Sequence, residues 1–158
     1  PFAIRYPRGE VTDAFDDFET MSVVYGKAEM IHKGSEIALV AVGSMVETAC
    51  EVRKILKEKG LDVTVVNERF IKPIDAGMIH KLSFDHKLIV TMEENVGLGG
   101  FGDTVCQYAD DSQLDVKVLN IALPDDYVEH GNVSILKKEE GIDAAGVADR
   151  VLSFYTNI

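Results

Sequence analysis

The sequence has little cysteine and no long hydrophobic run. Cys50 and Cys106 are its two cysteines, far apart and in no shared motif, which argues against a disulfide scaffold and indicates reduced thiols. No apolar stretch reaches the ~20 residues that a membrane-spanning helix needs, so we expect no membrane partner. The N-terminus lacks the layout of a secretory signal, which predicts a cytoplasmic protein. It begins with Pro1, not methionine, as a piece of a longer chain would.

Basic residues are also scarce relative to acidic ones. The chain has 16 Lys and Arg against 27 Asp and Glu, a formal net charge of −11. An acidic surface repels phosphate backbones, so nucleic acid is not expected as a partner. The acidic stretch 10–19 is interpreted as a solvated linker. The remaining composition, 46% hydrophobic over 158 residues, predicts one globular domain with a real core.

Metal-ligand and nucleophile motifs are missing. The four histidines lie at no metal-ligand spacing from one another or from cysteine, so no metal site is predicted. There is no nucleophile elbow or P-loop, and we assign no catalytic residue to the chain. His130, in YVEHG at 127–131, follows the last predicted strand. A structural or subunit-contact role is favoured for it over chemistry.

Apolar runs alternate with helical periodicity from residue 34 onward. This alternation predicts a doubly wound, three-layer α/β domain with a mostly parallel sheet. A short run at 27–33, a glycine and the next apolar run suggest a hairpin that adds one antiparallel edge strand. The predicted strands are 37–42, 61–66, 87–92 and 115–121, and the predicted helices are 44–59, 73–82, 100–109, 132–140 and 144–155.

A glycine-rich turn follows the third predicted parallel strand. Gly97, Gly99 and Gly102 match G-x-G-x-x-G between a strand and a helix, the context of a dinucleotide site. Two acidic residues precede the turn, and the next strand ends without an acid for a ribose hydroxyl. We therefore favour a structural role, in which glycine lets the helix start tight against the sheet, over nicotinamide or flavin binding.

The acidic pair before that turn is Glu93-Glu94. Adjacent strand residues point to opposite faces, so the two carboxyls cannot share a proton as a general acid/base pair. We expect one to face an interface or to cap the glycine turn. In RFIKPID at 69–75, Asp75 suits the first turn of a helix, and Arg69 and Lys72 are candidates for holding a carboxylate across an interface.

Two arginines flank the turn RYPRG at 5–9. Arginine is the side chain best suited to bidentate phosphate contacts, and a paired cationic turn is unusual in so acidic a chain. From the residues alone, Arg5 and Arg8 are equally compatible with a phosphate site and with surface ion pairs.

Five segments together resemble, in order, the C-terminal part of the 1-deoxy-D-xylulose-5-phosphate synthase family, whose members are transketolase-like thiamine-diphosphate enzymes. The terminal EHG and the opening RYPRG favour this family over transketolase and the β subunits of 2-oxo-acid dehydrogenases, which share two segments more loosely. The segments are RYPRG at 5–9, VGSMVETA at 42–49, NERFIKPID at 67–75, TMEENVGLGGFG at 91–102 and YVEHG at 127–131.

The resemblance implies a domain layout. Residues 1–9 would be the last strand and turn of a pyrimidine-binding domain, 10–33 a linker and edge strand, and 34–158 a transketolase-type C-terminal domain. Arg8, with Arg5 as second choice, would hold the phosphate of glyceraldehyde 3-phosphate. Glu93, Glu94 and His130 would be interface or supporting residues.

The resemblance also implies an activity for the full-length enzyme. It would join pyruvate, with loss of CO2, to glyceraldehyde 3-phosphate, giving 1-deoxy-D-xylulose 5-phosphate for isoprenoid and thiamine biosynthesis. Thiamine diphosphate and Mg2+ would be bound by upstream domains of the same polypeptide and not by this chain. This domain would support a homodimer and be inactive alone. A transketolase, a dehydrogenase β subunit and a stand-alone nucleotide-binding module remain the alternatives.

Overall fold

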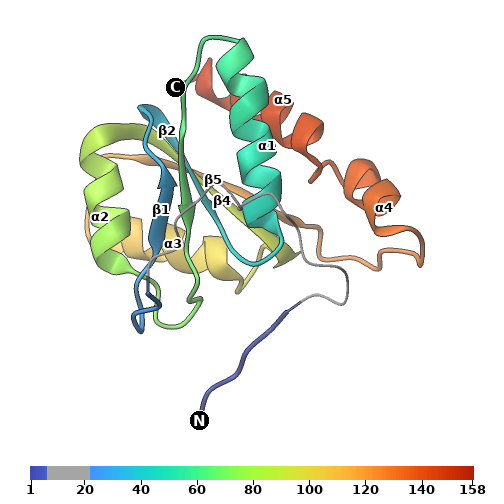
Figure 1. Cartoon of the computed structure of the whole chain (residues 1–158), viewed down its shortest axis with the longest axis horizontal. Coiled ribbons are helices and arrows are strands. Elements are labelled where there is room, and N and C mark those ends of the chain that lie inside the picture. Colours follow the sequence, from blue (N-terminus) through green and yellow to red (C-terminus); the bar gives the residue numbers. More distant parts are fainter. Residues whose placement is uncertain (7–21) are drawn as a thin grey trace.

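A computed structural model describes residues 1–6 and 22–158 and contains one five-stranded sheet (Figure 1). The strand order is β1-β3-β2-β4-β5, with β1 antiparallel to β3 and the other neighbouring pairs parallel. The strands are β1 (Glu29–His32), β2 (Glu36–Ala41), β3 (Thr64–Asn67), β4 (His86–Val96) and β5 (Lys117–Leu123). The helices are α1 (Met45–Glu58), α2 (Ala76–Asp85), α3 (Phe101–Asp111), α4 (Val133–Glu139) and α5 (Ala144–Tyr155).

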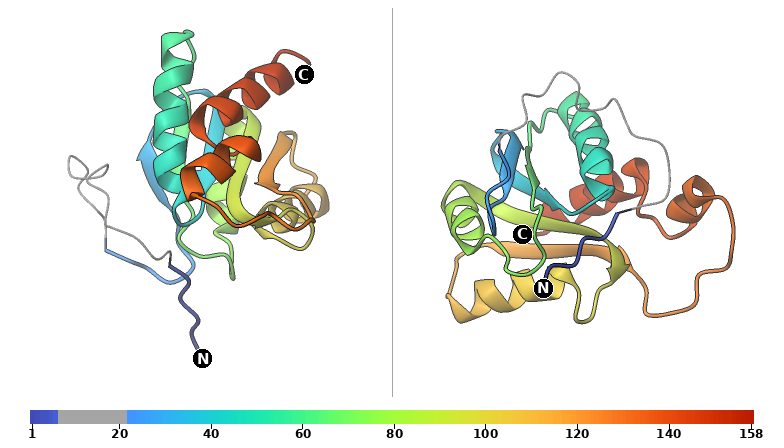
Figure 2. Two further views of the ribbon diagram at one scale, coloured as in Figure 1. Left: turned by 90° about the vertical axis from the view of Figure 1, so that its right-hand side faces the viewer. Right: turned by 60° about the horizontal axis from the view of Figure 1, so that its bottom comes forward.

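Helices cover both faces of this sheet, so the domain has three layers. In the right-hand view of Figure 2, α1 and α5 lie above the sheet and α3 lies below it. Leu39 of β2 packs in the cluster with α1 and α5, and its neighbour Val40 packs in the cluster with α2 and α3. Both are fully buried, which is why β2 is apolar from Ile37 to Ala41. The predicted fold class, with one antiparallel edge strand, is confirmed.

The predicted hairpin between the first two strands is wrong. β1 pairs with β3, with Glu29 opposite Asn67, and β3 lies between β1 and β2. Both edges of β2 are taken by parallel partners, which leaves the outer edge of β3 for β1. Gly34 marks a close crossing and not a hairpin turn, because a Cβ there would lie 2.1 Å from the carbonyl oxygen of Asp62.

Two element boundaries differ from prediction in ways that shape the sheet's carboxyl edge. β4 runs on to Val96, beyond the predicted 92, and so carries the acidic pair. α2 begins at Ala76, not at residue 73, because the Asp75 side chain caps it by accepting from the Met78 amide at 3.1 Å.

The N-terminal segment, residues 1–6, has no assigned strand and extends beyond the domain (Figure 1). The assignment of 1–9 to a preceding domain and of 10–33 to a linker and edge strand therefore stays a prediction, apart from β1 itself. Among the described residues, no helix is both long and apolar enough to cross a membrane.

Candidate functional site at the carboxyl edge of the sheet

The chain reverses its winding direction at the carboxyl ends of β2 and β4. After β2 the chain enters α1 on one face, and after β4 it enters α3 on the other. In open α/β sheets such a switch point forms the crevice where ligands bind. Glu93 and Glu94 lie at this point, and the alternation of strand side chains sends them to opposite faces.

Glu93 caps α3. Its side chain is 2% exposed, and its two oxygens accept from the backbone amides of Phe101 at 2.9 Å and Gly102 at 2.8 Å. Amides in the first turn of a helix have no partner within the helix and favour an anion. Here the chain supplies that anion itself, at the place where a bound pyrophosphate would sit. The geometry therefore counts against dinucleotide binding at this turn.

The glycines of the turn are explained by packing. A Cβ on Gly100 would lie 2.6 Å from a Glu93 carboxylate oxygen, and one on Gly102 would lie 2.3 Å from the Asn120 side chain. Gly99 has φ +71°, a left-handed conformation that favours glycine. The turn thus brings α3 close enough to β4 and β5 for the Glu93 cap to form, as the structural interpretation of the motif expects.

Glu94 joins three separate segments on the other face. Its carboxylate accepts from the Ser44 hydroxyl, just before α1, at 2.5 Å, and pairs with Lys137 of α4 at 2.5 Å. Its backbone oxygen accepts from the Arg5 guanidinium at 3.1 Å. Burial acts to raise the pKa of Glu94, but the Lys137 ammonium and the Ser44 hydroxyl outweigh it, so the pKa is lowered. Glu94 is therefore ionised near neutral pH.

Arg5 is exposed and lies beside Glu94. Arg8 falls outside the described residues, and His130 is exposed in the connection between β5 and α4. The phosphate role of Arg5 and Arg8 and the interface role of His130 therefore stay predictions.

Sequence reasoning missed Ser44 and Lys137 as partners of Glu94. Ser44 was recognisable as a residue opening a helix, but its hydroxyl contacts the strand and makes no cap bond.

The loop from β3 to α2 holds a second charged cluster. Arg69 forms a buried ion pair with Glu29 of β1, so it has a carboxylate partner within the chain. Asp75 accepts from the Ala28 amide at 3.0 Å and from Lys27 at 3.1 Å. Burial opposes ionisation of Asp75, yet these donors and the Met78 amide lower its pKa.

Glu68 differs from Asp75 in this cluster, because its pKa is raised and not lowered. It is fully buried, and one carboxylate oxygen accepts from the Asp75 amide at 2.5 Å. The other oxygen has no hydrogen-bond partner among the described residues. Burial raises the pKa of Glu68 to about 7, against the opposing effect of the Asp75 amide.

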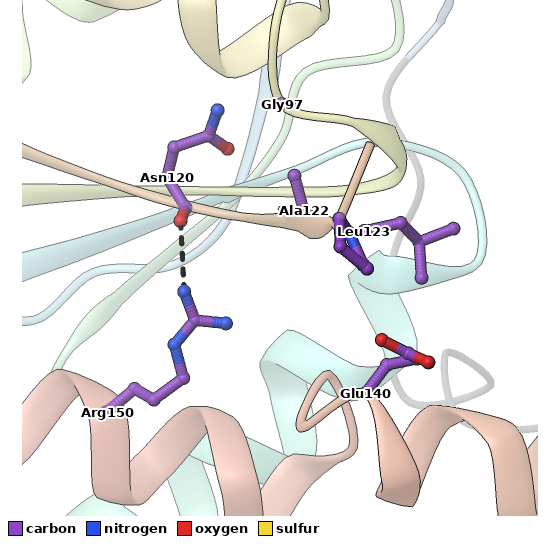
Figure 3. A pocket seen from close by; sticks show the side chains of 7 residues that line it. Gly97, Asn120, Ala122, Leu123, Glu140 and Arg150 are labelled. Atoms are coloured by element: carbon purple, nitrogen blue, oxygen red, sulfur yellow. Dashed lines mark hydrogen bonds between the residues drawn. The ribbon is translucent and has the colours of Figure 1, made fainter. Parts of the chain in front are cut away.

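An open pocket of about 470 Å³ lies beside the glycine turn, between β5 and α5. Figure 3 shows Arg150 reaching from α5 toward β5, where it donates to the Asn120 carbonyl oxygen at 3.4 Å, with Glu140 nearby. The Asn120 side chain points away from Arg150, and its amide oxygen accepts from the Thr91 hydroxyl at 3.2 Å. Of the predicted site residues that the structure describes, Arg5, Glu93, Glu94 and His130, none lines this pocket.

The described residues contain no group of three or more His, Cys, Asp or Glu side chains placed to hold a metal ion. The carboxyl edge of the sheet thus holds three features: the Glu93 cap of α3, the ionised Glu94 carboxylate that joins three segments, and the exposed Arg5. This arrangement can stabilise the domain and present a cation, but it contains no proton-transfer pair.

Comparison with known proteins gives a consistent family. The model described as "Transketolase, C-terminal domain" matches residues 26–147. A 1-deoxy-D-xylulose-5-phosphate synthase of Lachnoclostridium phytofermentans is 45% identical over 96% of this chain and 24% of its own length. One from Dehalococcoides mccartyi is 42% identical over 99% of the chain and 25% of its own length. The chain thus spans about a quarter of the length of these curated relatives.

Solved structures agree on the fold. A structure described as a split-gene transketolase, inactive beta4 tetramer, superposes with a TM-score of 0.80 at 25% identity, covering 86% of this chain and 44% of that one. A transketolase from Pichia stipitis has a TM-score of 0.57 at 19% identity, which supports the fold alone.

Proposed function

Because the chain belongs to the transketolase C-terminal-domain family, we propose that it is the C-terminal part of a 1-deoxy-D-xylulose-5-phosphate synthase. The observation that carries this proposal is 42–45% identity to two such synthases over nearly the whole chain. The similarity extends beyond residues 26–147 and so covers segments outside the family model. It includes the end of the chain that bears Arg5 and Arg8.

The proposed activity belongs to the full-length enzyme. It condenses pyruvate, with loss of CO2, and glyceraldehyde 3-phosphate to 1-deoxy-D-xylulose 5-phosphate, in the cytoplasm, as a homodimer. Thiamine diphosphate, held with Mg2+, would supply the carbanion chemistry. The described residues of this chain do not fit that cofactor, since they offer no metal-ligand cluster and fill their own helix N-terminus with Glu93. The upstream domains would therefore bind it.

This chain's own contribution is to present a cation and to support the fold. Arg8, with Arg5 as second choice, would hold the substrate phosphate in a bidentate contact. Arg5 donates to a backbone oxygen at the carboxyl edge and leaves its guanidinium exposed, a position compatible with a phosphate ligand. Glu94 would keep this edge in place through Ser44 and Lys137.

Transketolase remains a second candidate, because the split-gene transketolase superposes at a TM-score of 0.80. Its lower identity, 25%, makes it the weaker one. That structure is described as inactive, which supports the expectation that this 158-residue chain is inactive alone. The upstream sequence would also separate a dehydrogenase β subunit, since such a chain carries no diphosphate-binding domain.

The proposal is tested by CO2 release from pyruvate plus glyceraldehyde 3-phosphate, with thiamine diphosphate and Mg2+. The full-length gene product and the 158-residue chain are assayed side by side. We expect activity only in the full-length protein. Activity in neither, together with ketol transfer from xylulose 5-phosphate by the full-length protein, would favour transketolase.

The arginine assignment needs variants in the full-length enzyme. Arg8→Ala should raise the KM for glyceraldehyde 3-phosphate roughly 10- to 100-fold, because charge-assisted hydrogen bonds to a phosphate are worth about 1.5–3 kcal/mol. Affinity for thiamine diphosphate should not change. Arg5→Ala should have a smaller effect, and Lys54→Ala, which removes an exposed cation on α1 away from the pocket beside the glycine turn, is the control. Unchanged KM and kcat in Arg8→Ala would remove Arg8 from the site.

A further inference from the structure

Glu68 is a buried acid that the proposed function does not use. It directly follows β3 and is fully buried, and one of its carboxylate oxygens has no hydrogen-bond partner among the described residues. Burying an ionised carboxylate costs far more than burying a neutral one when donors are missing. This position therefore favours the protonated acid.

The charges around Glu68 do not offset this burial. Lys27, ahead of β1, is bonded to Asp75, and Arg69 is bonded to Glu29 of β1. The carboxylate of Asp75, the N-cap of α2, opposes a second negative charge nearby. From β2, the Ala41 carbonyl oxygen accepts from the Glu68 amide. Lys72, in the same loop, is exposed to solvent. Attraction by Lys27 is the smallest influence on the Glu68 carboxyl.

Glu68 also closes the loop that follows it. Its bonded oxygen accepts from the Asp75 amide at 2.5 Å and so joins the two ends of the 68–75 segment. Between these ends, Phe70 stacks edge-on against Tyr25, with ring centroids 5.6 Å apart. Tyr25 in turn stacks against Phe2 at 5.6 Å. The loop therefore supports a row of aromatic rings that includes Phe2 of the N-terminal segment.

We propose that Glu68 is a proton-dependent latch: the neutral, buried side chain holds the 69–74 loop against β3, and loss of its proton loosens that loop. Ionisation would leave a carboxylate oxygen buried without a donor, and the available relief is movement of the loop toward water. This inference concerns the domain itself and does not depend on which enzyme the chain completes.

The direction of the pH effect follows from linkage. The pKa of Glu68 is about 7 in the folded protein, against 4.5 for an unperturbed glutamate, so the folded state binds the proton more tightly. The resulting stability is complete below about pH 4.5 and is lost as the pH rises to about 7. Over this range the contribution to the folding equilibrium constant is on the order of a hundredfold.

The test compares the wild-type chain with Glu68→Gln by urea unfolding at several pH values between 5 and 8. Gln keeps an acceptor for the Asp75 amide but cannot ionise. Relative to Glu68→Gln, the wild type should lose on the order of a hundredfold in folding equilibrium constant over this range. Because the dependence of stability on pH is compared, any constant cost of the amide cancels. The contribution of His32, whose pKa burial lowers, is common to both proteins and cancels as well. Glu51→Gln, at an exposed position on α1, should follow the wild type.

Two further readouts keep the proposal falsifiable if Glu68→Gln does not fold. Carboxyl ¹³C NMR of the wild type should show one glutamate titrating near pH 7. Amide exchange of residues 69–75 should rise from pH 6 to pH 8 by more than the intrinsic tenfold per pH unit. Parallel pH profiles of wild type and Glu68→Gln, or the absence of a glutamate titrating above pH 6, would overturn the latch. Neither readout depends on enzymatic activity, so failure here leaves the synthase proposal standing.

Discussion

Glu93 Oε1 accepts a hydrogen bond of 2.8 Å from the backbone amide of Gly102, so a strand side chain caps the helix that follows it. This contact explains both the acidic residue and the glycine of a motif that otherwise resembles a dinucleotide site. The acid satisfies the helix amides, and the glycine lets the helix come close enough to be satisfied.

Removal of the cap should destabilise the domain. Glu93→Ala leaves two buried helix amides without partners and should lower the free energy of unfolding by about 2–3 kcal/mol. Glu93→Gln keeps one acceptor and should cost less. Urea unfolding measures both, with Glu51→Ala on the exposed face of α1 expected to change stability by less than about 0.5 kcal/mol. Equal stabilities of Glu93→Ala and Glu51→Ala would contradict the cap.

Gly102 should tolerate no side chain while Asn120 is opposite it. Gly102→Ala places a Cβ 2.3 Å from the Asn120 side chain and should cost at least about 2 kcal/mol of stability. Asn120→Ala removes the clashing atoms, so the double variant should recover part of that loss in a double-mutant cycle. Gly77→Ala, in α2, meets its nearest atom at 3.4 Å and is the matched control. A strictly additive cycle would place the strain elsewhere.

The layered fold was predictable because each of its strands and helices has a local pattern. β2 is apolar at every position from Ile37 to Ala41, and a strand buried on both faces requires this. The pairing of β1 was not predictable in the same way. A short strand beside a glycine is typical of a hairpin, but both edges of β2 are occupied by β3 and β4, so β1 pairs with the outer edge of β3.

Within the site, only features that follow from the alternation of side chains along a strand were predictable. The opposed directions of Glu93 and Glu94 follow from the strand period, and the cap was one of two roles expected. The partners of Glu94 come from α4 and from the chain before α1, distant segments that no local pattern connects. Glu68 gave no signal at all, because a glutamate at the end of a strand is usually solvated and its burial depends on how the loop folds over it.

The Lys137–Glu94 pair should hold α4 in place. No residue of α4 is buried, so this half-exposed ion pair is a large part of its attachment to the sheet. Lys137→Met should raise amide exchange across Val133–Glu139 roughly fivefold, the equivalent of about 1 kcal/mol. Lys138→Met changes an exposed neighbour and should have no such effect.

Acid should also loosen α4, because protonation of Glu94 breaks its ion pair with Lys137. The pKa of Glu94 is lowered in the folded protein, so the stability it provides is complete above about pH 4.5 and is lost as the pH falls through that lower value. Exchange or NMR of α4 should therefore respond below pH 4.5 in the wild type, and Lys137→Met should lack most of that response. An α4 that loosens equally in both proteins would assign the acid effect to other carboxyls.

A buried hydrogen-bond chain at the opposite edge of the sheet fixes the tautomer of His86. Its Nδ1 lies 3.0 Å from the Leu82 carbonyl oxygen, which can only accept, so Nδ1 carries the proton. In the neutral imidazole Nε2 then accepts from the Thr64 hydroxyl at 2.7 Å, and the Thr64 oxygen accepts from the Gly34 amide at 2.9 Å. This series of hydrogen bonds joins β3, β4 and the β1–β2 connection.

Thr64→Val should therefore destabilise the domain by about 2 kcal/mol, because it leaves the buried Nε2 of His86 and the half-buried Gly34 amide without partners while nearly conserving volume. Thr64→Ser keeps the hydroxyl and should lose only the methyl contribution, about 1 kcal/mol or less. Unfolding experiments rank the two variants, and ¹⁵N NMR of the imidazole reports the tautomer directly. A proton found on Nε2 in the wild type, or a valine variant as stable as the serine variant, would show that the hydroxyl does not donate to His86.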